Sequence, residues 1–292
     1  MMQIKQLSDC TVTEGTDAWN KGFEGYFFDM TMTEEAFSSR MTQEDLDPAL
    51  SVVAFRDGEP AGLVLNGIRE TGGRKVGWNG GTGVASSARG TGIGRRMMER
   101  SLELLREAGA EVATLEAISG NEPAIALYEK TGYRIIDRLQ FLHLNGKIGA
   151  ESETPADGRT EIKSPEEASR LPFYRADYPW QTMWQSAKGG EAIIAKNDAG
   201  TPVGYVVYRK VTDSGGKHIA TVVLQCEADP AYGEGLAVIR RLLNEAFDGY
   251  AGDIRRVAVN VPVNRSPLTH EALKERGFEL TSEQVDMRKE LI

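Results

Sequence analysis

The chain has 292 residues, of which 40% are hydrophobic, and a formal net charge of −9. This length suits two domains of ordinary size, and the negative charge argues against nucleic-acid binding. No apolar run reaches the roughly 18 residues of a membrane span, and no secretory signal is visible, so we expect a cytoplasmic protein without a membrane partner. Two distant cysteines and three scattered histidines predict neither a disulfide framework nor a metal site.

The most informative stretch runs from Val84 to Arg96 and has the pattern of a strand end, a glycine turn and a helix start. Glycines alternate at positions 90, 92 and 94, and an amphipathic pattern runs from Ile93 to Ala108. Such a turn brings the backbone close to a ligand, and the first helical turn adds unpaired N–H donors and partial positive charge. It therefore predicts a polyphosphate site, although the spacing fits neither the dinucleotide fingerprint nor the P-loop.

A second block follows this helix. Residues 112–117 form a short apolar run that predicts a strand. Asn121 fits a helix N-cap, and Gly132 fits the stop at the end of that helix. Asn121 and Tyr128 are seven residues apart, which is two helical turns, so we expect them on the same face.

In this order the two blocks resemble the GNAT superfamily of N-acetyltransferases. The family pattern Arg/Gln-x-x-Gly-x-Gly/Ala is met by Arg89, Gly92 and Gly94, and the second block by Asn121, Ala124, Leu127-Tyr128 and Gly132-Tyr133. Residues 50–65 also fit the family's early hairpin, turning at Asp57-Gly58. The chain departs from the family where a proline and an aromatic residue often precede the arginine, because Ser86 and Ala88 stand there.

The resemblance implies an α+β fold, a mixed but mainly antiparallel sheet flanked by helices, with two splayed central strands. Acetyl-CoA would insert its pantetheine arm between those strands, and no metal is implied. The Val84 N–H would stabilise the oxyanion of the reaction. The residues that the resemblance assigns to the coenzyme are Val84, Ala85, Ser86, Arg89, Gly90, Thr91, Gly92, Ile93, Gly94, Arg95, Asn121 and Tyr128.

The implied chemistry is direct attack of an amine on the thioester. Tyr128, with an ordinary pKa of about 10, would protonate the leaving thiolate of pKa about 8.5, at a cost of about 2 kcal/mol. The attacking amine must first lose a proton, and Glu116 and Glu24 are candidate bases. Residues 1–59 carry four basic and twelve acidic side chains. This excess fits a small cationic amine as acceptor, and it fits a solvated acidic surface equally well.

The second half repeats the order of the first. Gly204 and Gly277 stand where Gly62 and Gly132 stand, with a similar succession of strands and helices between them. We therefore expect two GNAT-like domains, a catalytic one over residues 1–148 and a degenerate one over residues 161–292, joined by a polar linker at 149–160.

The chemistry is not repeated. The counterpart of the glycine turn, residues 230–235, has no arginine, and Glu234 would repel phosphate oxygens. No tyrosine stands at the counterpart of Tyr128, so we expect this half to have a structural role. Trp180 and Trp184 are four residues apart and would share a helical face, lining a pocket, an interface or the core.

The favoured interpretation is a tandem N-acetyltransferase, monomeric or homodimeric, with one working site that acetylates a small primary amine. One alternative is a non-catalytic acyl-CoA-binding sensor or scaffold, against which Tyr128 and Asn121 argue, because binding alone needs no acid. Another is an acyltransferase whose second half is active, as in tandem family members that make bacterial thiol cofactors. The motif around Gly233, with its Glu234, opposes it.

Overall fold

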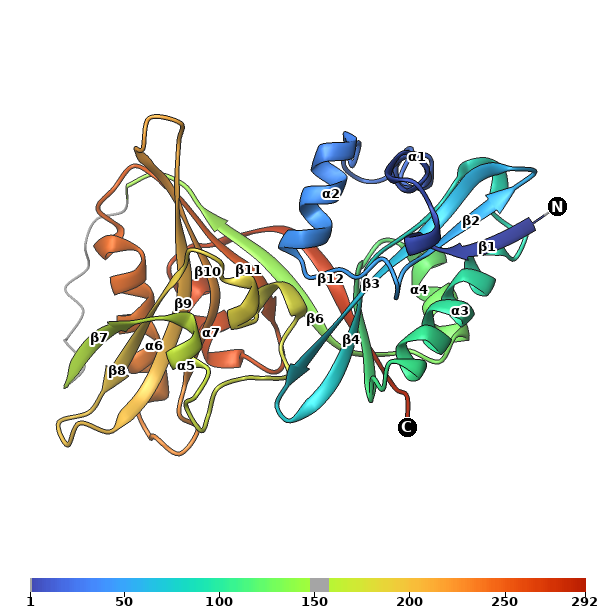
Figure 1. Cartoon of the computed structure of the whole chain (residues 1–292). Helices are drawn as coiled ribbons and strands as arrows, with labels where there is room; N and C mark the ends of the chain where they lie inside the picture. The colour runs from blue at the N-terminus through green and yellow to red at the C-terminus, as the bar shows by residue number, and fades with distance from the viewer. Residues whose placement is uncertain (1, 148–157) are drawn as a thin grey trace. The chain divides into compact units, whose positions relative to one another are not determined.

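The computed structural model describes residues 2–147 and 158–292. The chain divides into two compact units: unit 1 comprises Met1–Ile136 and Asp286–Ile292, and unit 2 comprises Asp137–Val285 (Figure 1). This division differs from the expected ranges because two long strands, β6 (Arg134–Leu144) and β12 (Glu279–Glu290), have residues in both units. Of the expected linker, residues 149–157 lie outside the described part, and Arg159 already begins a strand.

Unit 1 is built on five strands in the order β1-β2-β3-β4-β5, together with the end of β12. All neighbouring pairs among the five are antiparallel except β4–β5, which is parallel. The strands are β1 (Met2–Gln6), β2 (Val52–Arg56), β3 (Glu59–Thr71), β4 (Arg74–Val84) and β5 (Val112–Ile118). The helices are α1 (Val12–Gly22), α2 (Glu34–Gln43), α3 (Ile93–Glu107) and α4 (Glu122–Lys130), with 3₁₀ turns at Leu7–Asp9 and Ser86–Ala88.

Local sequence signals place these elements. The β2–β3 hairpin turns at Asp57 and Gly58, whose φ angles of 54° and 91° suit a tight hairpin turn. Asn121 is the N-cap of α4 and accepts a hydrogen bond from the Ala124 N–H, and Gly132 follows the helix with a φ of 93°. The predicted hairpin and the predicted helix ends are thereby confirmed.

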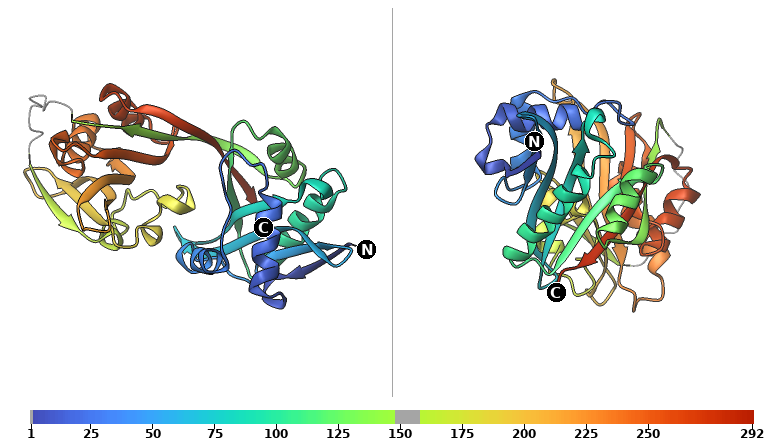
Figure 2. Two further views of the ribbon diagram at one scale, coloured as in Figure 1. Left: turned by 90° about the horizontal axis from the view of Figure 1, so that it is seen from above. Right: turned by 90° about the vertical axis from the view of Figure 1, so that its right-hand side faces the viewer.

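Helices cover both faces of this sheet (Figures 1 and 2). A Cβ at Gly62 would meet Met97 of α3, whereas a Cβ at Gly81 would meet Trp19 of α1. Gly62 pairs with Val84, three residues beyond Gly81, and residues an odd number apart on a strand face opposite sides. Glycines on these strands thus let α1 and α3 approach the sheet from opposite sides.

Unit 2 repeats this plan, with strand order β6-β11-β10-β9-β8-β7. Only β10–β11 is parallel among its paired strands, so the strand pairing of each unit is mixed and mainly antiparallel, as predicted. Its other strands are β7 (Arg159–Lys163), β8 (Glu191–Lys196), β9 (Pro202–Thr212), β10 (His218–Ala228) and β11 (Arg255–Pro262). The helices are α5 (Pro165–Ala168), α6 (Gly235–Ala246) and α7 (Pro267–Glu275), with 3₁₀ turns at Trp180–Thr182, Trp184–Ser186 and Asp248–Tyr250.

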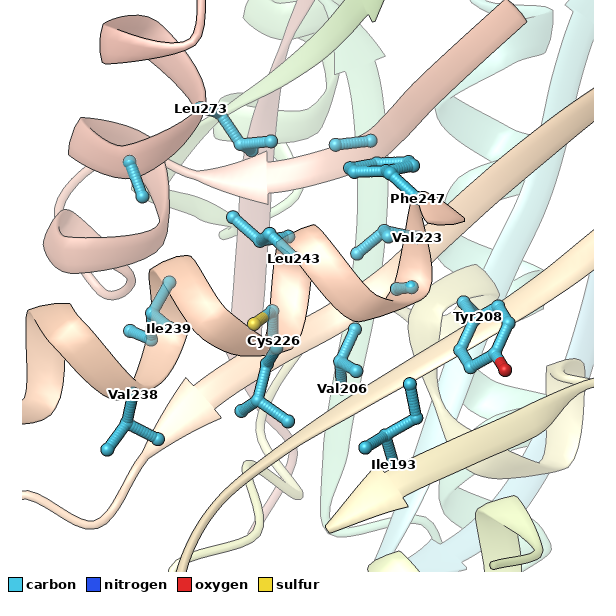
Figure 3. Packing of buried hydrophobic residues seen from close by; sticks show 14 of the residues in the cluster. Ile193, Val206, Tyr208, Val223, Cys226, Val238, Ile239, Leu243, Phe247 and Leu273 are labelled. Atoms are coloured by element: carbon cyan, nitrogen blue, oxygen red, sulfur yellow. The ribbon is translucent and has the colours of Figure 1, made fainter. Parts of the chain in front are cut away.

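One hydrophobic core of unit 2 lies between α6 and the strands beneath it, where Val238, Ile239 and Leu243 pack against Val206 and Cys226 (Figure 3). A second cluster of buried residues includes Tyr205 and Leu224. A Cβ at Gly204 would meet Val238 of α6, as one at Gly62 would meet Met97 of α3 in unit 1. None of the helices in residues 2–147 and 158–292 has both the length and the apolarity needed to cross a membrane.

The prediction that Trp180 and Trp184 share a helical face is wrong. The two tryptophans lie in separate 3₁₀ turns, because Met183 between them is extended, with φ −71° and ψ 155°. Trp180 is buried, and the backbone N–H of Trp184 donates to the Tyr174 hydroxyl. The spacing of four therefore carries no helical meaning here.

Candidate active site

The two central strands of unit 1 separate along their length. Pairing between β4 and β5 runs from Val76↔Val112 to Asn79↔Leu115 and ends there. Beyond that point β4 continues to Val84 and β5 to Ile118. The predicted splay of the central strands is therefore present, and it leaves a gap on the β5 side of β4.

The Val84 N–H faces this gap. The Ala85 N–H donates to the Ala61 carbonyl, which makes Gly62↔Val84 a pair without direct hydrogen bonds in the antiparallel ladder. The N–H and C=O of Val84 therefore point away from β3. The Val84 carbonyl accepts a hydrogen bond from Arg89 Nε at 3.0 Å. The Ala85 N–H, by contrast, is already used in the sheet and is not free for a ligand.

The glycine turn presents a row of unpaired donors. Gly90 and Gly92 have φ angles of 77° and 83°, and a Cβ on either would point into open space. Within residues 2–147 and 158–292, the N–H groups of residues 90–95 find no hydrogen-bond acceptor, and the first backbone bond of α3 is donated by Arg96. These donors, which include those of Thr91, Ile93, Gly94 and Arg95, gather at the start of α3, an arrangement that suits an anion.

Two arginine side chains of the turn, those of Arg89 and Arg95, have protein partners. Arg89 donates to the carbonyls of Val84 and Glu24, and Arg95 pairs with Glu99 one helical turn along at 2.8 Å. Ser86 starts the 3₁₀ turn that joins β4 to the glycines. The backbone amides are therefore the groups that are available to an anion, and the guanidinium groups add positive charge around them.

Tyr128 is buried on α4, and its hydroxyl has a hydrogen bond with Thr82 of β4. Thr82 lies two residues before Val84, in the part of β4 that β5 no longer pairs. The phenol therefore stands at the gap. Burial is the main cause that raises the pKa of Tyr128 to about 12.

Glu116 lies on β5, one residue past the last β4–β5 pair. Its Oε2 accepts a hydrogen bond from Trp78 Nε1 at 2.7 Å, whereas Oε1 is buried and has no partner within the described residues. Burial first, and then the negative charge of Asp286, raise the pKa of Glu116 to about 8. Such a carboxyl group is neutral at pH 7 and can act as a base slightly above it.

Sequence reasoning missed Tyr26. This side chain has a hydrogen bond with Asn121 and interacts electrostatically with Tyr128, and burial raises its pKa. It lies in the segment between α1 and α2, where four aromatic residues fall within six positions, 23–28. This concentration of aromatic residues is the sequence feature that could have identified the segment. Glu24, the other candidate base, is exposed in the same segment.

The corresponding gap in unit 2 is filled. Pairing between β10 and β11 ends at Val223↔Ala258, but the Thr269 hydroxyl of α7 donates to the Cys226 carbonyl of β10. Leu273 of α7, which corresponds in the sequence repeat to Tyr128 of α4, is fully buried. Glu234 is the N-cap of α6, with φ −106° in place of the positive φ of Gly92. No group of metal-ligating side chains occurs within the described part of the chain.

Comparison with known proteins gives the same picture for the first half. Residues 14–133 match the model of the Acetyltransferase (GNAT) family. N-alpha-acetyltransferase MAK3 of Arabidopsis thaliana is 31% identical over 99 residues, which are 34% of this chain and 52% of that protein. Mycothiol acetyltransferase of Propionibacterium freudenreichii is 32% identical over 106 residues, 36% of this chain and 34% of that protein. The match thus spans about half or less of these relatives.

Solved structures extend the likeness of fold to the whole chain. A GCN5-related N-acetyltransferase from Sphaerobacter thermophilus has a TM-score of 0.61 at 18% identity, covering 100% of this chain and 95% of that one. A tandem GNAT protein from the clavulanic acid biosynthesis pathway has a TM-score of 0.58 at 15% identity, covering 100% and 99%. The first half of the chain therefore matches the GNAT family of acetyltransferases over residues 14–133, and the whole chain has the fold of a tandem GNAT protein.

Proposed function

We propose that unit 1 transfers the acetyl group of acetyl-CoA to a primary amine by direct attack. The observation that carries this proposal is the gap between β4 and β5, which has the unpaired amides of residues 90–95 at the glycine turn and the Val84 N–H along its side. The amides suit a diphosphate, and the strand edge suits the amide groups of a pantetheine arm.

In the proposed reaction the neutral amine attacks the thioester carbonyl and the thiolate leaves. The Val84 N–H stabilises the oxyanion, a role that is typically worth about 2.7–4 kcal/mol. Glu116 accepts the proton that the amine loses, through water where the two do not touch. The N-acetylated amine and the free thiol of coenzyme A are the products.

The pKa of Tyr128 refines its role. A phenol of pKa about 12 lies about 3.5 units above a thiol, so full proton transfer to the thiolate costs about 5 kcal/mol. This is more than the cost expected from an ordinary tyrosine. We therefore assign Tyr128 the donation of a hydrogen bond to the departing thiolate, with the proton following from solvent.

Unit 2 is proposed to bind no acyl-coenzyme. The Thr269 hydroxyl donates a hydrogen bond to the Cys226 carbonyl, on the side of β10 where the gap of unit 2 would lie. Glu234 adds negative charge at the position where a diphosphate would bind. Its part in the protein is then structural.

Calorimetric titration with acetyl-CoA tests these assignments. We expect one binding event, which Gly92→Glu weakens at least about tenfold by placing a carboxylate among the donors. Gly92→Ala is the matched control, because it carries the same cost of a positive φ without the charge. Gly233→Glu, in the turn of unit 2 that precedes α6, should leave binding unchanged. Equal effects of Gly92→Glu and Gly92→Ala would contradict a phosphate site at this turn.

An assay of thiol release across a panel of amines then tests catalysis. Amine-dependent release of coenzyme A supports the enzyme. Tight acetyl-CoA binding with no release for any amine would instead support the sensor or scaffold alternative.

A further inference from the structure

Unit 1 has a second feature beside the gap, a cavity of about 520 Å³ that is open to solvent and is lined by residues 20–31 at the end of α1 and before α2. Its walls include Phe23, Tyr26, Phe27 and Phe28. Three of these rings form a continuous series, with centroids 5.3 Å apart for Phe23–Tyr26 and 5.2 Å apart for Tyr26–Phe27. Phe27 and Phe28 are 54% and 56% exposed. Two adjacent exposed phenylalanines on a cavity are a strong indication of an apolar ligand.

This aromatic cavity adjoins the proposed reaction centre. Tyr26, one of its walls, has a hydrogen bond with Asn121 and interacts with Tyr128. The Phe27 ring comes within 4.0 Å of where a Cβ on Gly120 would lie. Phe23 packs against Gly83, the residue before Val84. The same short segment therefore touches β4 and the start of α4, the two elements that carry Val84 and Tyr128.

The charge of the cavity favours a cation. Three charged residues line it, Lys21, Glu24 and Asp29. Lys21 is already paired with Glu59 at 3.3 Å. The Glu24 carboxylate has no hydrogen bond or ion pair within residues 2–147 and 158–292, and Asp29 accepts one N–H, from Thr31. Carboxylates next to aromatic faces are the combination that attracts an ammonium group.

We propose that the aromatic cavity holds the acetyl acceptor, and that this acceptor is a small amine with one ring-sized apolar group. The inference rests on the proposed function and adds the acceptor class to it. A cavity of this volume, open on one side, is of the size that takes a single small molecule. The rings take the apolar group, and Glu24 and Asp29 attract the ammonium form on its way to the thioester.

In the reaction, the amine loses one proton to Glu116 or water and forms the N–C bond. The C–S bond breaks, and the thiolate takes up a proton. The products are an N-acetylated arylalkylamine and coenzyme A.

Calorimetry on the full chain tests the cavity without relying on catalysis. The probes are 2-phenylethylamine and ethanolamine, which are both primary amines and differ in the ring. We expect the aromatic amine to bind at least about tenfold more tightly, because only its ring buries apolar surface. Phe27→Ala and Phe28→Ala should each weaken it about five- to tenfold. Ile162→Ala, at another apolar residue that is 68% exposed but lies in unit 2, is the matched control.

Charge and acceptor size have their own measurements. Glu24→Gln should weaken both amines about threefold, the effect of one exposed ion pair. A phenylalanyl tripeptide amide is the third probe, and tighter binding of this peptide than of 2-phenylethylamine would overturn the assignment to a small molecule. Equal affinities for the two simple amines, or phenylalanine variants that bind like the Ile162 control, would overturn the cavity assignment.

The two proposals fail separately. If the aromatic amine binds more tightly but no thiol is released, the cavity assignment is supported and the proposed acetyl transfer is contradicted. If thiol is released with equal kcat/KM for 2-phenylethylamine and ethanolamine, the proposed acetyl transfer is supported. The proposal of an aromatic acceptor is then contradicted.

Discussion

The carboxyl group of Glu116 loses most of its contact with water and receives one hydrogen bond, from Trp78. Because its pKa is about 8, the fraction that can act as a base rises as pH increases through that value. We expect kcat/KM to increase with pH over the same range. Glu116→Gln should lower kcat/KM and abolish this increase with pH. The acceptor should be an amine of pKa well below 7, so that its own ionisation does not contribute. If kcat/KM of the variant still increased with pH as in the wild type, Glu116 would be excluded as the base.

The same group makes stability depend on pH. Its pKa is higher in the folded chain than the ordinary 4.5, so the folded state holds a proton that the unfolded state has lost between these values. The stabilising effect is complete below about pH 4.5 and is lost as pH rises through about 8. Urea unfolding at pH 5, 7 and 9 should show a smaller decline for Glu116→Gln than for the wild type. Parallel declines would mean that Glu116 titrates normally.

Tyr128 and Tyr133 are a matched pair of buried phenols. The Tyr128 hydroxyl meets Thr82 at the gap, whereas the Tyr133 hydroxyl is buried with no partner within the described residues. Tyr128→Phe should reduce kcat about a hundredfold with little change in acetyl-CoA affinity, since it removes only a donor to the leaving group. Tyr133→Phe should keep wild-type kcat and stability. Steady-state kinetics and calorimetry on both variants decide whether the role of Tyr128 is chemical or only structural.

At the scale of elements, glycines set how closely α1 lies on β4. A Cβ at Gly22, the last residue of α1, would come within 2.9 Å of the Gly83 backbone. Backbone cannot move aside as a side-chain end can, so Gly22→Ala should lower the free energy of unfolding by about 1–3 kcal/mol. Gly233→Ala, where a Cβ meets nothing within 4 Å, should have almost no effect. Denaturant unfolding compares the two, and equal stabilities would mean that α1 shifts without cost.

Elements with local signals were predictable from the sequence. Asn121 begins α4 because its side chain caps the helix, and Gly132 follows the helix end because it can adopt a positive φ. The Asp57-Gly58 turn likewise needs positive φ angles. The Trp180–Trp184 prediction failed because a spacing of four has helical meaning only inside a helix, and Met183 is extended. Periodicity alone does not reveal such a break.

The properties of the site depended on distant residues, so sequence could name its members but not their chemistry. The sequence pointed to Tyr128 and Glu116, but their raised pKa values come from burial and from Tyr26 and Asp286. Tyr26 is brought to Asn121 by the path of the segment after α1, which no motif marks. Likewise, the strand order does not follow from the motifs, and so the return of the last residues to unit 1 was not foreseen.

At the scale of the whole molecule, the fold of unit 1 depends on the far end of the chain. Strand β12 is the hydrogen-bonded neighbour of β5, and Asp286–Ile292 belong to unit 1. There Arg74 donates to Glu290 at 2.6 Å, and the Leu291 N–H donates to the Glu111 carbonyl at 2.8 Å. Residues 1–148, the range expected to form the catalytic domain, would lack these contacts and would expose β5 as an unpaired edge.

Deletion of residues 286–292 should therefore lower the unfolding temperature by several degrees and promote aggregation, since a lost strand removes several hydrogen bonds and uncovers an edge. It also removes the Asp286 charge beside Glu116. Deleting only Ile292, which is 88% exposed, is the control and should leave the unfolding temperature unchanged. Calorimetric scans and light scattering on both deletions measure these effects. If the longer deletion unfolds at the wild-type temperature and stays monodisperse, then unit 1 is complete without the carboxyl-terminal strand, and residues 1–136 fold as an independent unit.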